Sequence, residues 1–123
     1  MNIDNIYEAY YDCAIWSSAD WRVTGAERLD PPHLEDVEFS LTSDFHDRFK
    51  KDVIDFCNAN RVLLEASGLT DSQIGHDFWL TRNHHGAGFW DRGIDEIGER
   101  LTEAAQIYPE INLYIGDDGN LYF

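Results

Sequence analysis

The residues from His76 to Gly93 constrain the fold of this chain more than any other stretch. As a β-strand, residues 78–82 would place Phe78, Leu80 and Arg82 on one face and Trp79 and Thr81 on the other. The polar, glycine-bearing residues from Asn83 to Gly88 can reverse the chain, and residues 89–91 can return as the partner strand. The pattern predicts a β-hairpin that buries aromatic rings.

Apolar side chains recur every three or four residues in three other stretches, which is the spacing of amphipathic helices. These stretches are residues 3–16, 43–67 and 94–108. Gly68 and Pro109 are placed to end the second and third helices, and Asp91 can cap the third. Thr70 and Gln73 match a capping box, which predicts one further helical turn at this point.

A second hairpin is predicted at the C-terminal end, where alternating apolar residues at 111–115 precede the strong turn signal of residues 117–120. The order helix, loop, helix, two strands, helix, two strands indicates an α+β fold, with two or three main helices packed on a small antiparallel sheet of two hairpins. Residues 1–123 are expected to form one domain. Within it we predict an acidic, loop-rich segment at 17–41 and a hairpin–helix–hairpin unit at 76–123.

Acidic residues outnumber basic ones by 24 to 9, which gives a formal net charge of -15. Direct binding to nucleic acid needs clustered Lys and Arg that neutralise phosphates, so this class of function is disfavoured. A partner with a basic surface, such as one that normally holds nucleic acid, would be attracted. Solubility alone is the other explanation of the acidity.

Carboxylates are spaced four residues apart along the predicted first helix, and further ones crowd the loop that follows it. This spacing is typical of a solvated helix face, and it would also suit an acidic surface that a basic partner could contact. The predicted contact residues are Asp4, Glu8, Asp12, Asp20, Glu35, Asp36 and Glu38.

Histidine and aspartate side chains gather near the predicted first hairpin, at His76, Asp77, His85 and Asp91. Such groups can bind a metal ion or act as a general base and its partner. No known ligand spacing is present, and turn and rim residues of a sheet would have the same composition. We therefore expect no metal, no cofactor and no catalytic residue, and keep a small metal-dependent or hydrolytic enzyme as the alternative.

Cys13 and Cys57 lie on apolar helix stripes, and this pattern favours two buried, reduced thiols over a disulfide. No apolar run approaches the ~20 residues that span a bilayer, and the N-terminus lacks the pattern of a signal peptide. A cytoplasmic location, without membrane contact, is expected.

The second half of the chain resembles a family of small uncharacterised proteins of bacteriophages and mobile elements. The resemblance is carried by the run DFWLTRN of residues 77–83, by HGAGFWDRG of residues 85–93, and by the ending YIGDDG of residues 114–119. Relatives often have Gly where His84 stands in this chain. The resemblance implies a phage setting, and it implies no mechanism.

Small, strongly acidic phage proteins often resemble DNA mimics, in which carboxylates replace phosphates on a host defence complex. The leading hypothesis is an anti-defence inhibitor in a bacterial host cell, an anti-CRISPR or antirestriction protein that blocks DNA access. An accessory phage protein that binds an ordinary protein partner is the remaining alternative.

Overall fold

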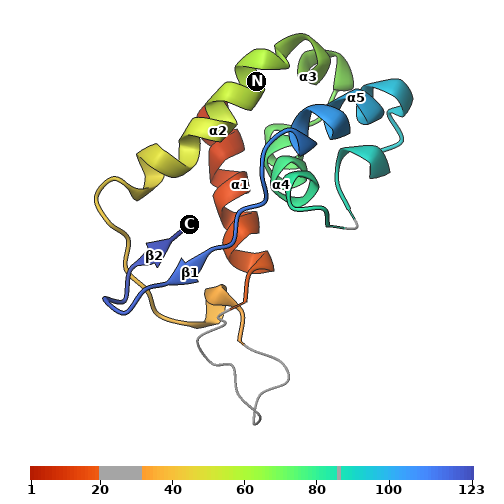
Figure 1. Cartoon of the computed structure of the whole chain (residues 1–123). Helices are drawn as coiled ribbons and strands as arrows, with labels where there is room; N and C mark the ends of the chain where they lie inside the picture. The colour runs from red at the N-terminus through yellow and green to blue at the C-terminus, as the bar shows by residue number, and fades with distance from the viewer. Residues whose placement is uncertain (20–31, 86) are drawn as a thin grey trace.

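The computed structural model describes residues 1–19, 32–85 and 87–123, which form five α-helices, two 3₁₀ turns and one two-stranded antiparallel hairpin (Figure 1). In chain order the elements are α1 Ile3–Ser17, η2 Leu34–Asp36, α2 Phe45–Ala59, α3 Arg61–Ser67, α4 Asp71–Arg82, η3 Phe89–Asp91, α5 Asp95–Gln106, β1 Tyr114–Ile115 and β2 Leu121–Tyr122. Helices dominate the described residues, so the predicted α+β fold with a sheet of two hairpins is wrong.

The largest difference from the prediction is at residues 78–82, which belong to helix α4 and do not form a strand. The predicted capping box is present: Thr70 Oγ1 accepts from the Gln73 amide at 3.1 Å, and Gln73 Oε1 accepts from the Thr70 amide at 3.0 Å. It begins a helix of 12 residues and not a single turn. The helical period was hidden because α4 is buried on several sides and so has no continuous polar face. Its buried residues are Ile74, Gly75, Asp77, Phe78, Trp79, Thr81 and Arg82.

After α4 the chain reverses through Gly88, whose φ of 154° lies in the region that favours glycine. A Cβ atom at this position would overlap the Thr81 hydroxyl. Residues 89–91, predicted as the returning strand, form the 3₁₀ turn η3. The hairpin–helix–hairpin unit predicted for 76–123 is therefore a helix, a turn, a helix and one hairpin.

Aromatic rings from four elements stack into one column at the centre of the core. Tyr10 of α1 stacks on Phe78 of α4 with ring centroids 5.4 Å apart. Phe78 stacks on Phe56 of α2 at 4.1 Å, and Phe56 stacks on Phe89 of η3 at 5.8 Å. All four side chains are fully buried, so the column joins the helices through apolar burial and ring contacts.

Helices α1 and α4 cross closely because Gly75 has no side chain at the crossing point. A Cβ atom built on Gly75 would lie 2.8 Å from the Tyr10 amide nitrogen and closer still to the Ile6 carbonyl oxygen. The crossing therefore depends on glycine at this position.

Two predicted helix boundaries also differ from the structure. The helix predicted over 43–67 is interrupted at Asn60, whose side-chain amide donates to the Phe56 carbonyl at 2.9 Å, and the chain continues as α3 until Gly68 in the left-handed conformation. Asp91 does not cap the third helix, because α5 begins at Asp95. The first helix and the C-terminal hairpin, with Tyr114 opposite Tyr122, are confirmed.

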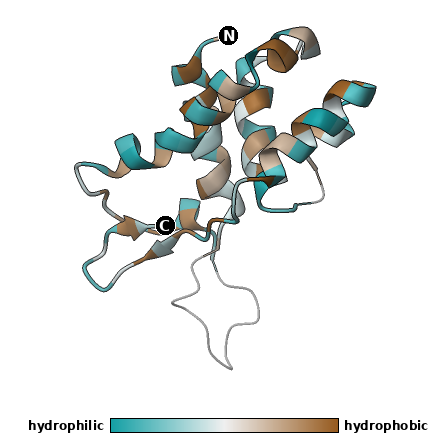
Figure 2. Ribbon diagram, turned by 45° about the horizontal axis from the view of Figure 1, so that its top comes forward, coloured by the Kyte–Doolittle hydropathy of each residue, from teal (hydrophilic) through white to brown (hydrophobic). Residues whose placement is uncertain are grey.

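The hairpin β1–β2 packs beside the chain that leads into α2 (Figure 1). Ser40 donates its amide to the Gly119 carbonyl at 2.9 Å and accepts from the Leu121 amide at 2.8 Å. Hydrophobic and hydrophilic residues alternate along the helices, as amphipathic packing requires (Figure 2). Among the described residues no helix has both the length and the apolar character needed to cross a membrane.

Cys13 and Cys57 are buried and unpaired, which confirms the predicted reduced thiols. Burial raises the pKa of each thiol to about 12. The thiolate is the reactive form, so we expect native protein to react slowly with DTNB at pH 8 and to release two equivalents after unfolding in guanidinium chloride. Rapid, stoichiometric labelling of the native protein would contradict this burial.

The same shift sets a pH dependence of stability. Exposed thiols in the unfolded chain have a pKa near ~8.5, so between that pH and about 12 the folded state holds more protons. The contribution of the buried thiols to the free energy of unfolding is fully present below pH ~8.5 and falls as the pH rises through this window. Thermal unfolding followed by circular dichroism should give a lower Tm at pH 10 than at pH 8.

Candidate functional site

The most distinctive feature of the surface is a hollow of about 520 Å³ where α1, η2 and α4 meet, which we call the acidic hollow. Carboxylates and aromatic rings line it together. The lining residues are Tyr11, Asp12, Ile15, Trp16, Glu35 and His76.

The position of η2 beside the end of α1 brings Glu35 into the acidic hollow. The Leu34 amide donates to the Ser18 carbonyl at 2.9 Å, and the Leu34 side chain is fully buried. His33 Nδ1 lies 2.9 Å from the Trp16 carbonyl oxygen, to which it donates in the Nδ1-protonated tautomer. These contacts hold Glu35 against α1 although the two elements are far apart in sequence.

Trp16 is the exposed aromatic of the acidic hollow, with 54% of its surface accessible. Its ring stacks with that of His76 on α4, with centroids 6.4 Å apart and planes inclined by 30°. On α1, Trp16 follows Asp12 by four residues, so both side chains lie on the same helix face. A ligand here would meet carboxylates and an aromatic ring at once, which suits a cation with an apolar stem.

The structure separates the predicted acidic contact residues into groups. Glu8 and Asp12 are exposed one turn apart on α1, and Glu35 and Asp36 are exposed on η2, which is bonded to the end of α1. Asp12 and Glu35 share the acidic hollow.

The remaining predicted contacts lie elsewhere. Asp4 forms an ion pair with Lys50 of α2, which reduces its value as a contact for a basic partner. Glu38 borders a different hollow, next to Gly119. Asp20 lies outside the described residues. The structure thus brings Asp12 and Glu35 together at one hollow, and the contact set as a whole stays a prediction.

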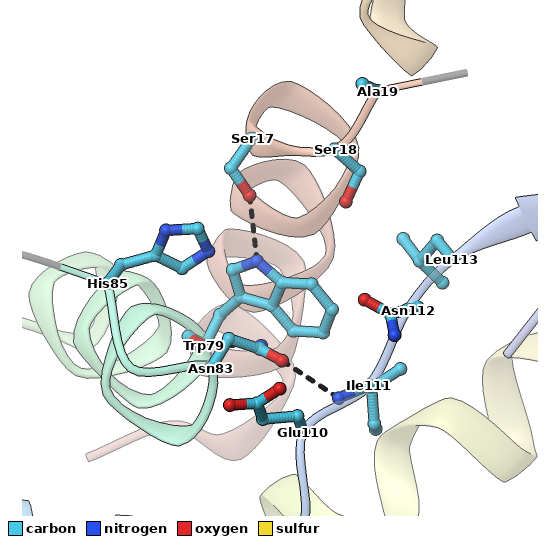
Figure 3. A pocket seen from close by; sticks show the side chains of 10 residues that line it. All are labelled: Ser17, Ser18, Ala19, Trp79, Asn83, His85, Glu110, Ile111, Asn112 and Leu113. Carbon is cyan, nitrogen blue, oxygen red and sulfur yellow. Dashed lines mark hydrogen bonds between the residues drawn. The ribbon is translucent and has the colours of Figure 1, made fainter. Parts of the chain in front are cut away.

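A second hollow, of about 280 Å³, lies between the end of α1 and the segment 110–113, with Trp79 at its base (Figure 3). The Trp79 indole donates to Ser17 Oγ at 2.8 Å, and Asn83 Oδ1 accepts from the Ile111 amide at 2.8 Å. These two hydrogen bonds join α4 to α1 and to the C-terminal segment. His85 also lines this hollow, where the Ser17 hydroxyl accepts the hydrogen bond from the Trp79 indole.

The four residues of the alternative enzyme hypothesis do not converge. His76, Asp77 and Asp91 border a third hollow, of about 190 Å³, whereas His85 lines the one above Trp79. Asp77 is buried, and both of its oxygens accept from Arg92 at 2.8 Å. This contact also raises the pKa of the Arg92 guanidinium. Within the described parts of the chain, no three His, Cys, Asp or Glu side chains are arranged to hold a metal ion.

Sequence reasoning missed Trp16, Tyr11 and His76 as members of the acidic hollow. The spacing from Asp12 to Trp16 on a predicted helix was the available signal for Trp16. His76 carried no such signal, because it precedes residues 78–82, which were predicted as a strand, and its approach to α1 depends on α4. Comparisons with protein-family models, with curated proteins and with solved structures find no match to the chain.

Proposed function

We propose that the protein is a phage-encoded anti-defence inhibitor, an anti-CRISPR or antirestriction protein that acts in the cytoplasm of the host cell. In this proposal it binds a host complex at its basic, nucleic-acid-binding surface and blocks access of DNA. The observation that supports the proposal is the meeting of carboxylates from α1 and η2 at one exposed hollow, on a chain with a net charge of -15.

The spacing of the carboxylates on α1 can be compared with that of phosphates. Glu8 and Asp12 are separated by four residues, or ~6 Å along the helix axis. One strand of B-DNA has one phosphate per ~3.4 Å of axis, so a single helix row has about half that charge density. Glu35 and Asp36 add charge beside the row. The summed field would speed encounter with a basic groove, where displaced counterions favour binding.

The first test is a pull-down from bacterial lysate with the tagged full chain, followed by displacement with duplex DNA. We expect a nucleic-acid-binding complex that is recovered at ~0.1 M salt and lost at ~1 M salt, where the Debye length falls from ~10 Å to ~3 Å. Neutralising Asp12, Glu35 and Asp36 together, as Asp12→Asn, Glu35→Gln and Asp36→Asn, should weaken this binding about tenfold, at roughly 0.5 kcal/mol per exposed charge.

The matched control neutralises three exposed carboxylates elsewhere, as Glu99→Gln, Glu103→Gln and Asp117→Asn. Both triple variants have the same net charge, so a difference between them reports on position and not on total acidity. Equal binding by the two variants would contradict the proposal, as would a partner that DNA does not displace. Binding that is indifferent to salt would instead favour an accessory protein with an ordinary protein partner.

A further inference from the structure

We infer that the acidic hollow binds an arginine side chain of the partner protein. The inference depends on the proposed function for its partner, and it names the chemical group that this surface recognises. Charge mimicry alone requires only carboxylates, yet the exposed Trp16 ring lines the same hollow as Asp12 and Glu35. An exposed indole at this point indicates a ligand with a flat or apolar part as well as a positive charge.

The lining of the hollow matches a guanidinium better than other cationic groups. Asp12 and Glu35 supply carboxylate oxygens from two different elements, while Tyr11, Ile15 and Trp16 supply ring and apolar surface. A guanidinium is planar, stacks on indole rings and forms two parallel hydrogen bonds to a carboxylate. An ammonium group is compact and more strongly hydrated, so it gains less from the ring. An anionic ligand would be repelled by both carboxylates.

Contacts within the chain hold Trp16 and the backbone of η2 in place before a ligand arrives. His76 stacks on Trp16, and the contacts of His33 and Leu34 fix η2 against α1. Less side-chain entropy is then lost on binding, which favours recognition of a single partner residue.

The test is a nuclear magnetic resonance titration of the ¹⁵N-labelled full chain with N-acetyl-arginine amide. N-acetyl-lysine amide and N-acetyl-citrulline amide serve as comparison ligands, because citrulline keeps the shape of arginine without its charge. We expect saturable shifts at the Trp16 indole and at the amides of Asp12 and Glu35. Binding of the lysine and citrulline probes should be several-fold weaker.

The matched pair of variants is Trp16→Leu and Trp90→Leu, because Trp90 has the same exposed fraction of 54% and lies outside the hollow. Trp16→Leu should weaken binding of the arginine probe about tenfold, as expected for loss of a partly desolvated cation–π contact. Trp90→Leu should leave it unchanged. Equal binding of arginine and citrulline, shifts spread over the whole surface, or no effect of Trp16→Leu would each overturn the inference.

The capped amino acids test the hollow without the partner, so the two proposals can fail separately. If the triple neutralisation weakens partner binding but Trp16→Leu behaves as Trp90→Leu, the acidic surface functions without an arginine contact and the inference is wrong. If the arginine probe binds as expected but no DNA-displaced partner is recovered, the anti-defence function is wrong and the arginine-binding property of the hollow stands.

Discussion

Alanine at position 75 is expected to destabilise the protein by about 3 kcal/mol, or to prevent folding, although glycine-to-alanine changes in helix interiors usually stabilise by ~1 kcal/mol. At this position the change in the free energy of unfolding should have the opposite sign. The new methyl group would lie 2.8 Å from the Tyr10 amide nitrogen and nearer to the Ile6 carbonyl oxygen. Both are backbone atoms of α1, so no side-chain rotation can relieve the overlap. The helices would have to separate, and the contacts of the aromatic column on both sides would loosen.

Urea denaturation followed by circular dichroism measures this change. Ser72→Ala is the control, because Ser72 is exposed in the same helix and alanine there should be neutral or slightly stabilising. If Gly75→Ala raises the free energy of unfolding as Ser72→Ala does, the close crossing of α1 and α4 is wrong.

Sequence motifs correctly predicted the parts of the fold that are held by contacts between residues close in sequence. The capping box at Thr70 and Gln73 involves residues three apart, and the turn at 117–120 is held by contacts within itself, such as Asn120 amide to Asp118 Oδ1 at 3.0 Å. The apolar period of residues 3–16 correctly predicted α1, since one side of that helix faces solvent.

Helix α4 could not be recognised in the same way. A period of 3.6 residues is visible only when one face is polar, and α4 packs against other elements on several sides. Arg82 and Asp77 added to the error, because charged residues usually mark exposed positions. Both are buried here with hydrogen-bond partners distant in sequence, and residue spacing alone does not reveal those partners.

The candidate site was predictable to the extent that it lies on α1. Helical spacing placed Glu8 and Asp12 on one face, and the same rule applied to Trp16 would have added the indole. The approach of Glu35 depends on the hydrogen bond from the Leu34 amide to the Ser18 carbonyl, which joins separate segments. That proximity is a tertiary property, so the sequence predicted an acidic surface without its shape.

Replacing Arg82 with methionine is expected to lower the free energy of unfolding by about 3 kcal/mol. The guanidinium is fully buried, and it donates from Nε and Nη2 to the Pro109 carbonyl at 3.1 and 2.7 Å. Nη1 donates to the Tyr10 hydroxyl at 3.1 Å and to Asp52 Oδ2 at 2.8 Å. One side chain thus joins α1, α2, α4 and the segment after α5. Methionine fills much of the volume but donates no hydrogen bond, so the Pro109 carbonyl and the Tyr10 hydroxyl would be left without this partner.

Two further variants distinguish the loss of the Arg82 hydrogen bonds from the loss of its positive charge. Arg100→Met removes a guanidinium that is 60% exposed and that pairs, within the described part of the chain, with Glu96 on the same helix, so a change below ~0.5 kcal/mol is expected. Asp52→Asn removes the charge partner of Arg82, but the Asp52 side chain is 42% exposed and water can replace it, so a loss of about 1 kcal/mol is expected. Urea denaturation should therefore rank the losses as Arg82→Met, then Asp52→Asn, then Arg100→Met. If Arg82→Met is no more destabilising than Asp52→Asn, the ion pair carries the contribution of Arg82 and the bonds to Tyr10 and Pro109 add little.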